Sequence, residues 1–133
     1  PGSRLADLAQ ALPRIRERWG KLNPAPTRQI PILVGGGGEK KTLRYTAEHA
    51  QIWHSFGDVD VLTRKNGILD AHCADVGREP AEIERSIGVQ KPPGEVADAL
   101  VAAGATLFTV GVGGPDYDLG LLKEWIAWRD ARS

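Results

Sequence analysis

The sequence has no methionine and only one cysteine, Cys73, among its 133 residues. A lone cysteine excludes an internal disulfide and is typical of a reducing compartment, so we expect a cytoplasmic location. The N-terminal residues are polar and helical in pattern, unlike a signal peptide. The chain opens Pro1-Gly2-Ser3, which we interpret as the remnant of a cleaved tag, followed by one domain over residues 4–133.

Net charge and long apolar runs are missing as well. The 17 basic residues balance the 17 acidic ones, and no stretch of lysine and arginine exceeds two residues. The electrostatic footprint of a nucleic-acid binder is therefore absent. No apolar run approaches the roughly 18 to 20 residues that a membrane span needs. We expect neither a nucleic acid nor a membrane as a partner.

Short apolar runs alternate with amphipathic segments along the chain. Strands are predicted at residues 30–34, 51–56, 83–89 and 105–112, the first of them buried on both faces. Helices are predicted at residues 39–50, from Asp58 or Asp60 to Gly77, at residues 95–103 with Gly104 as their end, and from Asp116 or Asp118 onward. Helical spacing places Leu43 and Ala47 on the apolar side of the helix at residues 39–50, and Leu62 and Leu69 on that of the next helix. Two helices are predicted within residues 4–21, because Pro13 fits best in the first turn of a second helix.

Four repeats of a strand and a helix with short links predict an α/β fold with a parallel sheet and right-handed crossovers. An open doubly wound sheet and part of a barrel both satisfy this pattern. The sequence pattern leaves the two alternatives open.

The most unusual stretch is Gly35, Gly36, Gly37 and Gly38, which follows the first strand and precedes a helix. Glycine lets a ligand approach the backbone closely, and a helix start offers unpaired N–H groups and a partial positive charge. The amides from Gly36 to Glu39 therefore predict an anion site, most plausibly for phosphate. Neither the P-loop nor the dinucleotide fingerprint fits the run. A glycine turn required only for steric reasons is the alternative.

Few other side chains suggest chemistry. His54 is expected at the carboxyl end of the second strand, where an imidazole can donate to phosphate or act as an acid or base, although a structural role explains it too. His49 and His72 are expected at the surface, and Cys73 as a buried, inert thiol. Lys40, Lys41 and Arg44 either reach a phosphate or form a solvated helix face; Trp125 is expected in the core. No set of side chains has the spacing of a metal site.

A resemblance adds to this pattern. The segments PILVGGGGEKKTLRYTAEHAQIWHSFGD, LDAHCADVGREPAEIERSIGV and AAGATLFTVGVGGPDYDLGLLKEWIAWRDA resemble the C-terminal part of the luciferase-like monooxygenase family. The likeness is greatest to the actinobacterial branch that uses the deazaflavin coenzyme F420. The resemblance implies a (β/α)₄ unit that corresponds to strands 5 to 8 of a TIM-type (β/α)₈ barrel, preceded by N-terminal helices; the family's N-terminal half lies outside this sequence.

The resemblance also implies a cofactor site. The four glycines and Glu39 would cradle the phosphate of F420, with FMN as the alternative coenzyme. Trp53, His54 and Ser55 would face the coenzyme or the substrate, and Gly88, Val89 and residues 111–114 would rim the same face. Active sites of such barrels draw on loops all around the ring, so we expect an oxidoreductase half that is inactive alone. A non-catalytic binding or interaction module is the alternative.

Half a barrel also leaves its first and last strands without partners. Ile32, Val34, Ile52 and Leu107 or Phe108 are expected to point inward with no opposite half to pack against. Unprotected strand edges invite pairing, and closed two-fold dimers are the commonest homo-oligomers. We therefore expect a homodimer; an open sheet that the N-terminal helix shields is the competing arrangement.

Overall fold

A computed structural model describes residues 2–132, so Pro1 of the expected tag remnant lies outside the described residues. Strands and helices alternate as the sequence pattern predicts. The elements are α1 (Gly2–Trp19), β1 (Leu33–Gly35), α2 (Thr42–His49), β2 (Ile52–Ser55), α3 (Val59–Asp75), the 3-10 helix η1 (Pro80–Glu82), β3 (Glu84–Val89), α4 (Pro93–Ala102), β4 (Leu107–Val110) and α5 (Gly120–Asp130).

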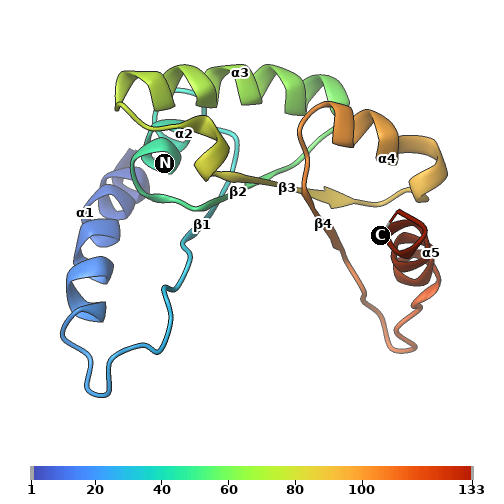
Figure 1. Cartoon of the computed structure of the whole chain (residues 1–133), viewed down its shortest axis with the longest axis horizontal. Helices are drawn as coiled ribbons and strands as arrows, with labels where there is room; N and C mark the ends of the chain where they lie inside the picture. The colour runs from blue at the N-terminus through green and yellow to red at the C-terminus, as the bar shows by residue number, and fades with distance from the viewer. Residues whose placement is uncertain (1, 133) are drawn as a thin grey trace.

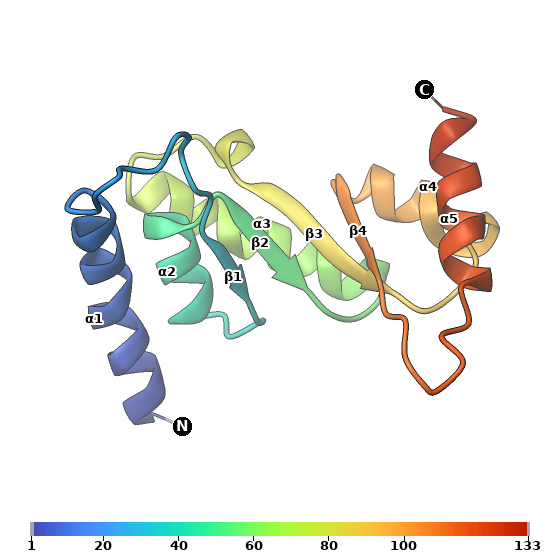
Figure 2. The same ribbon diagram turned by 90° about the horizontal axis from the view of Figure 1, so that it is seen from below.

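The four strands form one parallel sheet in the order β1-β2-β3-β4. Each strand lies beside the next one in sequence, so every crossover advances in the same direction. Right-handed crossovers that all advance one way place their helices on one face. Figure 1 shows α2, α3 and α4 on the same side of the sheet, and Figure 2 shows the strands from below with α2 and α3 behind them. This order excludes a doubly wound sheet, in which the strand order reverses.

The face under the helices carries the core. Strand register places Val34, Trp53 and Arg85 side by side on this covered face, followed by Ile87 and Phe108. Trp53 and Ile87 pack with apolar residues of the helices in one cluster, and burying each such side chain contributes roughly 1.5 to 3 kcal/mol. The helical residues that this cluster buries completely are Leu43, Ala47, Leu62, Leu69 and Cys73.

The other face of the sheet has no helix layer. Leu33 of β1 is 51% exposed there, and Ile52, His54 and Leu107 are partly buried. The expectation that the first strand is buried on both faces is therefore wrong. Val34, which we expected to point inward, is buried on the covered face instead. The remaining elements flank this uncovered face as two legs, α1 with its connector beside β1 and α5 beside β4 (Figure 1).

Several boundaries differ from the predicted ones. Helix α1 runs through Pro13 in one piece, although a proline inside a helix removes one N–H donor and crowds the carbonyl group of the preceding turn. Strand β1 begins at Leu33 because Pro31 lacks an N–H and the Ile32 amide donates to the Gln51 side chain at 2.9 Å instead of to the ladder. Strand β4 has only the four residues that face β3.

Two helix starts also lie later than expected. Helix α2 begins at Thr42, after a turn over residues 39–41, because Glu39 is held outside the helix by ion pairs to α3. Helix α5 begins at Gly120, whose amide donates to Asp118 Oδ1 at 2.8 Å. On α5, Trp125 is buried as expected, whereas Ile126 is 39% exposed.

Candidate anion-binding loop

Residues 35–39, here called the glycine loop, follow β1 at the carboxyl edge of the sheet. Gly35 is the last residue of β1 and pairs with His54 of β2. The carbonyl groups of the loop are all directed at protein donors. Gly36 O accepts from Trp53 Nε1 at 2.9 Å, and Gly38 O accepts from the Leu43 amide at 3.0 Å. Gly37 O accepts from Lys65 Nζ, and Glu39 O lies 2.8 Å from His72 Nε2.

The amides of the loop are mostly free. Gly36 N donates to His54 O at 3.2 Å. Within residues 2–132, the N–H groups of Gly37, Gly38 and Glu39 have no acceptor. Consecutive backbone N–H groups that are free to donate, while their carbonyl groups bond to other donors, are well suited to bind an anion. The site differs from the expected one in two respects. Gly36 N already has an acceptor, and the free amides lie before and at the start of the turn over residues 39–41, instead of at the first residue of α2.

The glycines are also required by their neighbours. A Cβ at Gly37 would lie 2.6 Å from Lys65 Nζ, and a Cβ at Gly38 would lie 2.7 Å from Thr42 Oγ1. Gly36 has a φ of 122°, which side chains with a Cβ rarely adopt. Both explanations of the glycine run therefore have support: close neighbours leave no room for a Cβ, and free amides are available to an anion.

Lys65 was not singled out by sequence reasoning, because it belongs to α3, beyond the next strand. Its side chain is 14% exposed, and its ammonium lies 3.7 Å from Glu39 Oε1. Arg64 also pairs with Glu39. Two cations and one carboxylate leave this cluster with a net positive charge, which favours an anion over a cation at the loop.

The basic residues that sequence reasoning did select are either exposed or paired with carboxylates outside the glycine loop. Lys40 and Lys41 are exposed. Arg44 pairs with Glu48 at 2.7 Å and lies 3.6 Å from Asp75, so it is directed along α2 and toward α3. The hydrogen bond that Arg44 donates to Glu48 raises the pKa of Arg44. Arg44 therefore stays charged but has carboxylate partners of its own.

His54 lies on the uncovered face next to the loop. Its Nδ1 is 2.8 Å from Ser86 Oγ, and its ring meets Phe56 edge to face at 4.7 Å. A Cβ at Gly88 would lie 3.7 Å from His54 Nε2, so the second nitrogen has the adjacent glycine beside it. The structure thus brings Gly35, His54 and Gly88 together on one face near the carboxyl ends of three strands.

Trp53 and Ser55 point the other way. Both lie on the covered face, with Trp53 at 0% and Ser55 at 1% exposure, although both were expected to face a ligand. Alternation along β2 puts them opposite His54. Trp53 supports the loop from behind through its bond to Gly36 O. The Ser55 hydroxyl has no partner within the described chain.

The remaining candidates lie in the core, beside α1 and against the glycine loop. Cys73 is buried as expected, and burial raises the pKa of its thiol. His49 and His72 are partly buried, which corrects the expected surface positions, because α1 covers the first and the Glu39 carbonyl binds the second. Burial, and then the charge of Arg16, lower the pKa of His49.

The part of the chain that the structure covers holds no cluster of three metal-ligating side chains. Of its helices, none is both long and apolar enough to cross a membrane. Neither a family model nor a curated protein matches this sequence.

Proposed function

We propose that this chain is the C-terminal half of a luciferase-like (β/α)₈ oxidoreductase, and that its glycine loop binds the phosphate group of coenzyme F420 or FMN. The observation that carries the proposal is the set of free amides at Gly37, Gly38 and Glu39, beside the Lys65 ammonium. Ligand sites of parallel α/β proteins lie at the carboxyl ends of the strands, where this loop is found.

The winding of the sheet supports the barrel part of the proposal. Sequential parallel strands with helices on one face are the arrangement of every segment of a (β/α)₈ barrel. In such a barrel the uncovered face, with His54 and Ser86, would point into the ring. His54 is the side chain best placed to contact the polar part of a coenzyme, since Ser86 fixes its ring. The lone buried thiol of Cys73 suits a cytoplasmic protein.

The same geometry argues that this chain does no chemistry alone. Hydride transfer needs the coenzyme ring and the substrate held together, and such positioning draws on groups around the whole rim. The described residues supply one side of that rim. We expect no change in coenzyme absorbance when the purified chain is mixed with reduced coenzyme and an acceptor.

A non-catalytic module is the second candidate function. The close contacts of Lys65 with Gly37 and of Thr42 with Gly38 favour it, because they explain the glycines without a ligand. The two functions differ in whether the free amides bind an anion.

An NMR titration of the isotope-labelled chain with inorganic phosphate, and then with FMN and F420, tests this difference. We expect the amide signals of Gly37, Gly38 and Glu39 to shift together and to saturate at one concentration. Gly37→Val should abolish these shifts, because a branched side chain displaces Lys65 and fills the loop.

The matched control is Gly113→Val, since a Cβ at Gly113 meets nothing within 4 Å. This variant should bind as the unmodified chain does. Phosphate shifts that avoid residues 37–39, or equal binding by the Gly37→Val protein, would contradict the phosphate site and favour the non-catalytic module.

A further inference from the structure

The chain exposes more surface than a compact monomer of its size. Its accessible surface is 8663 Å². A folded monomer of 14.3 kDa is expected to expose about 6,800 Å². The excess is about 1,900 Å². Obligate dimers bury about 1,000 to 2,500 Å² per partner, so the excess is of the size that one stable interface covers.

Part of the apolar surface lies on the uncovered face of the sheet. Leu33 is 51% exposed, and Ile52 and Leu107 are partly exposed on the same face. Within the described residues, β1 and β4 each have a strand on one side only. Open parallel edges with apolar flanks favour pairing with a further strand.

A groove of about 640 Å³ lies beside the edge of β4. Its apolar lining includes Leu107 and Val110 of β4 and Leu122, Trp125, Ile126 and Trp128 of α5. The groove therefore lies between the last strand and the last helix, where the next strand of a sequentially wound sheet would pair. Phe108, which stacks on Trp125 at 4.8 Å, closes its inner side.

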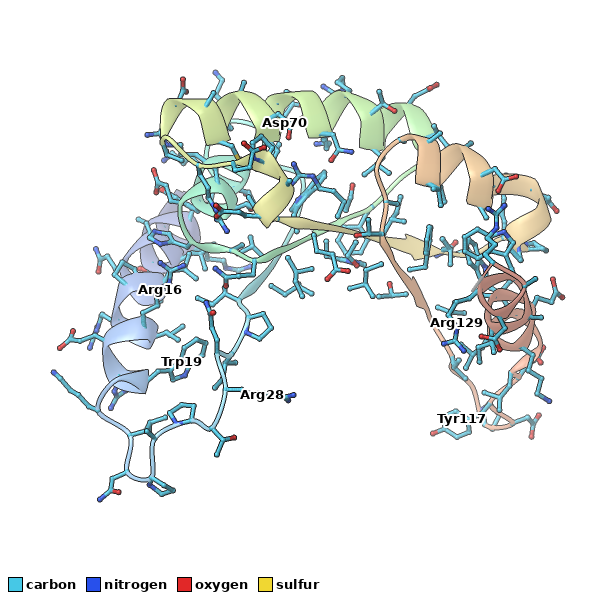
Figure 3. The ribbon with its side chains drawn as sticks, viewed as in Figure 1. Arg16, Trp19, Arg28, Asp70, Tyr117 and Arg129 are labelled. Carbon is cyan, nitrogen blue, oxygen red and sulfur yellow. The ribbon has the colours of Figure 1, made fainter. Side chains whose placement is uncertain are left out.

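A second groove, of about 570 Å³, lies between α1, its connector and the amino end of the sheet. Trp19, Ile30 and Ile32 contribute apolar side chains to its lining, but most of its lining residues are charged or polar. Figure 3 shows Trp19 between α1 and the connector, and Arg28 directed away from α1 toward the space between the two legs. The apolar groove therefore lies at the β4 edge, and the groove near the other edge is largely polar.

The two legs of the molecule also carry opposite net charge. Residues 2–32 have six basic and two acidic side chains, whereas residues 111–132 have three basic and four acidic ones. Contact between the first leg of one chain and the second leg of another is therefore favoured by electrostatic attraction.

We propose that two copies of this chain, where the N-terminal half of the proposed barrel is not present to close the sheet, associate about a two-fold axis parallel to the strands, so that β4 of each copy pairs with β1 of the other. Such an axis keeps all eight strands parallel, closes both open edges and turns both uncovered faces inward. A second copy supplies the two edges that are needed, and it brings the positive leg of one chain to the negative leg of the other. The dimer also places both glycine loops at the same end of the closed sheet, so that each loop faces residues of the partner.

The test is the molar mass of the 133-residue chain by sedimentation equilibrium at micromolar concentration. We expect twice the monomer mass, and we expect Leu33→Lys to raise the dimer dissociation constant about 30-fold or more, because it puts a charge into the centre of the interface. Leu22→Lys is the matched control. Leu22 is 50% exposed and follows α1, where its amide donates to Trp19 O at 3.3 Å. The segment after α1 forms the tip of that leg, away from the strands (Figure 1).

Cysteine cross-linking distinguishes the proposed pairing from other dimers. Leu33→Cys protein is mixed with Leu107→Cys or with Thr109→Cys protein and oxidised; Cys73 is fully buried and does not compete. A disulfide between the two different chains supports the pairing of β1 with β4. The Leu33→Cys protein alone should stay uncross-linked, because the two β1 strands lie on opposite sides of the barrel.

A monodisperse monomer with cooperative unfolding would overturn the proposal, and so would a cross-link that forms between two β1 strands or in neither mixture. The proposal does not depend on the coenzyme. If the protein is a dimer but phosphate shifts no amide signal of the glycine loop, only the proposed function is overturned. If the protein binds phosphate as a monomer, only the dimer is overturned.

Discussion

The chain has two glycine-rich segments that follow parallel strands, and they differ in how closely other residues contact them. In the glycine loop, residues 35–39, carbonyl groups accept from Trp53 and Lys65, and two glycines have neighbours within 3 Å of a hypothetical Cβ. In residues 111–114, a Cβ at any of the three glycines would meet nothing within 4 Å. Similar composition thus gives one fixed loop and one open loop.

The helices that follow the two segments differ in the same way. Helix α2 packs against α1 and α3 and is fully buried at Leu43 and Ala47. Helix α5 packs mainly on α4 and β4, and only Trp125 is buried among its residues. A fixed loop conformation therefore needs supporting side chains from other elements, and glycine alone does not supply them. Three experiments test this contrast between the two segments.

The largest effect is expected from the tryptophan behind the glycine loop. Trp53→Ala should lower the free energy of unfolding by about 3 to 5 kcal/mol, because a fully buried ring is lost. Trp53→Phe should cost less, since it keeps most of the packing and removes mainly the bond to Gly36 O. Urea unfolding followed by circular dichroism measures both.

The control for this change is Trp128→Ala on α5, the helix that follows the open segment, where the ring is only partly buried and packs on Phe108 and Trp125. It should destabilise the chain less than Trp53→Ala. Equal losses for the two tryptophans would show that α5 is packed as firmly as the region behind the glycine loop.

A smaller effect is expected from the lysine above the loop. Lys65→Met keeps the length of the side chain but removes its charge and its bond to Gly37 O. Loss of one charge-assisted bond should weaken phosphate binding about tenfold. The phosphate titration of the glycine loop amides measures it. Lys40→Met, at an exposed position of the adjoining turn, should leave affinity nearly unchanged; a tenfold loss there too would mean that only long-range charge matters.

The smallest effect concerns pH and the attachment of α2. The pKa of His49, at the end of α2, is lowered by burial and by Arg16, whereas the unfolded histidine titrates near its ordinary value of about 6.5. Below that pH the unfolded chain binds a proton that the folded chain resists. This contribution is therefore complete above about pH 6.5 and is lost as the pH falls through the folded pKa.

The measurement is the free energy of unfolding as a function of pH. His49→Gln should flatten the decline on the acid side of neutrality, and hydrogen exchange should show α2 opening before α5, since residues 111–132 contain no histidine. An unchanged pH profile in the variant would assign the decline to another group.

Much of the fold could be predicted from local sequence alone. Apolar spacing placed Leu43, Ala47, Leu62 and Leu69 in the core, and all are fully buried. Asp58 was one of two predicted caps for α3, and its side chain accepts from the Val61 amide at 3.0 Å. Gly104 was predicted to end α4, and its φ is 97°. These features depend on a few adjacent residues, whose dihedral preferences and periodicity are written in the chain.

Element ends and side-chain directions were less predictable. Helix α2 starts late because Glu39 pairs with residues of α3. Strand β1 starts late because Pro31 has no N–H and the Ile32 amide donates to the Gln51 side chain, so that only the Ile32 carbonyl bonds to the neighbouring backbone. Trp53 and His54 are adjacent in sequence, but only the position of the helices decides which of the two is buried. Both outcomes depend on contacts between elements far apart in the chain.

By itself, the sequence determined the alternation of strands and helices, the core positions of the helices and the glycine run at the end of the first strand. The tertiary structure decided that all crossover helices cover one face, that His54 lies on the open face, and that Lys65 lies over Gly37. The physical reason is the distance along the chain over which the responsible interactions act. Helix caps, turns and periodic burial follow from forces between near neighbours, whereas strand order and the meeting of α3 with the glycine loop depend on the free energy of packing the whole chain.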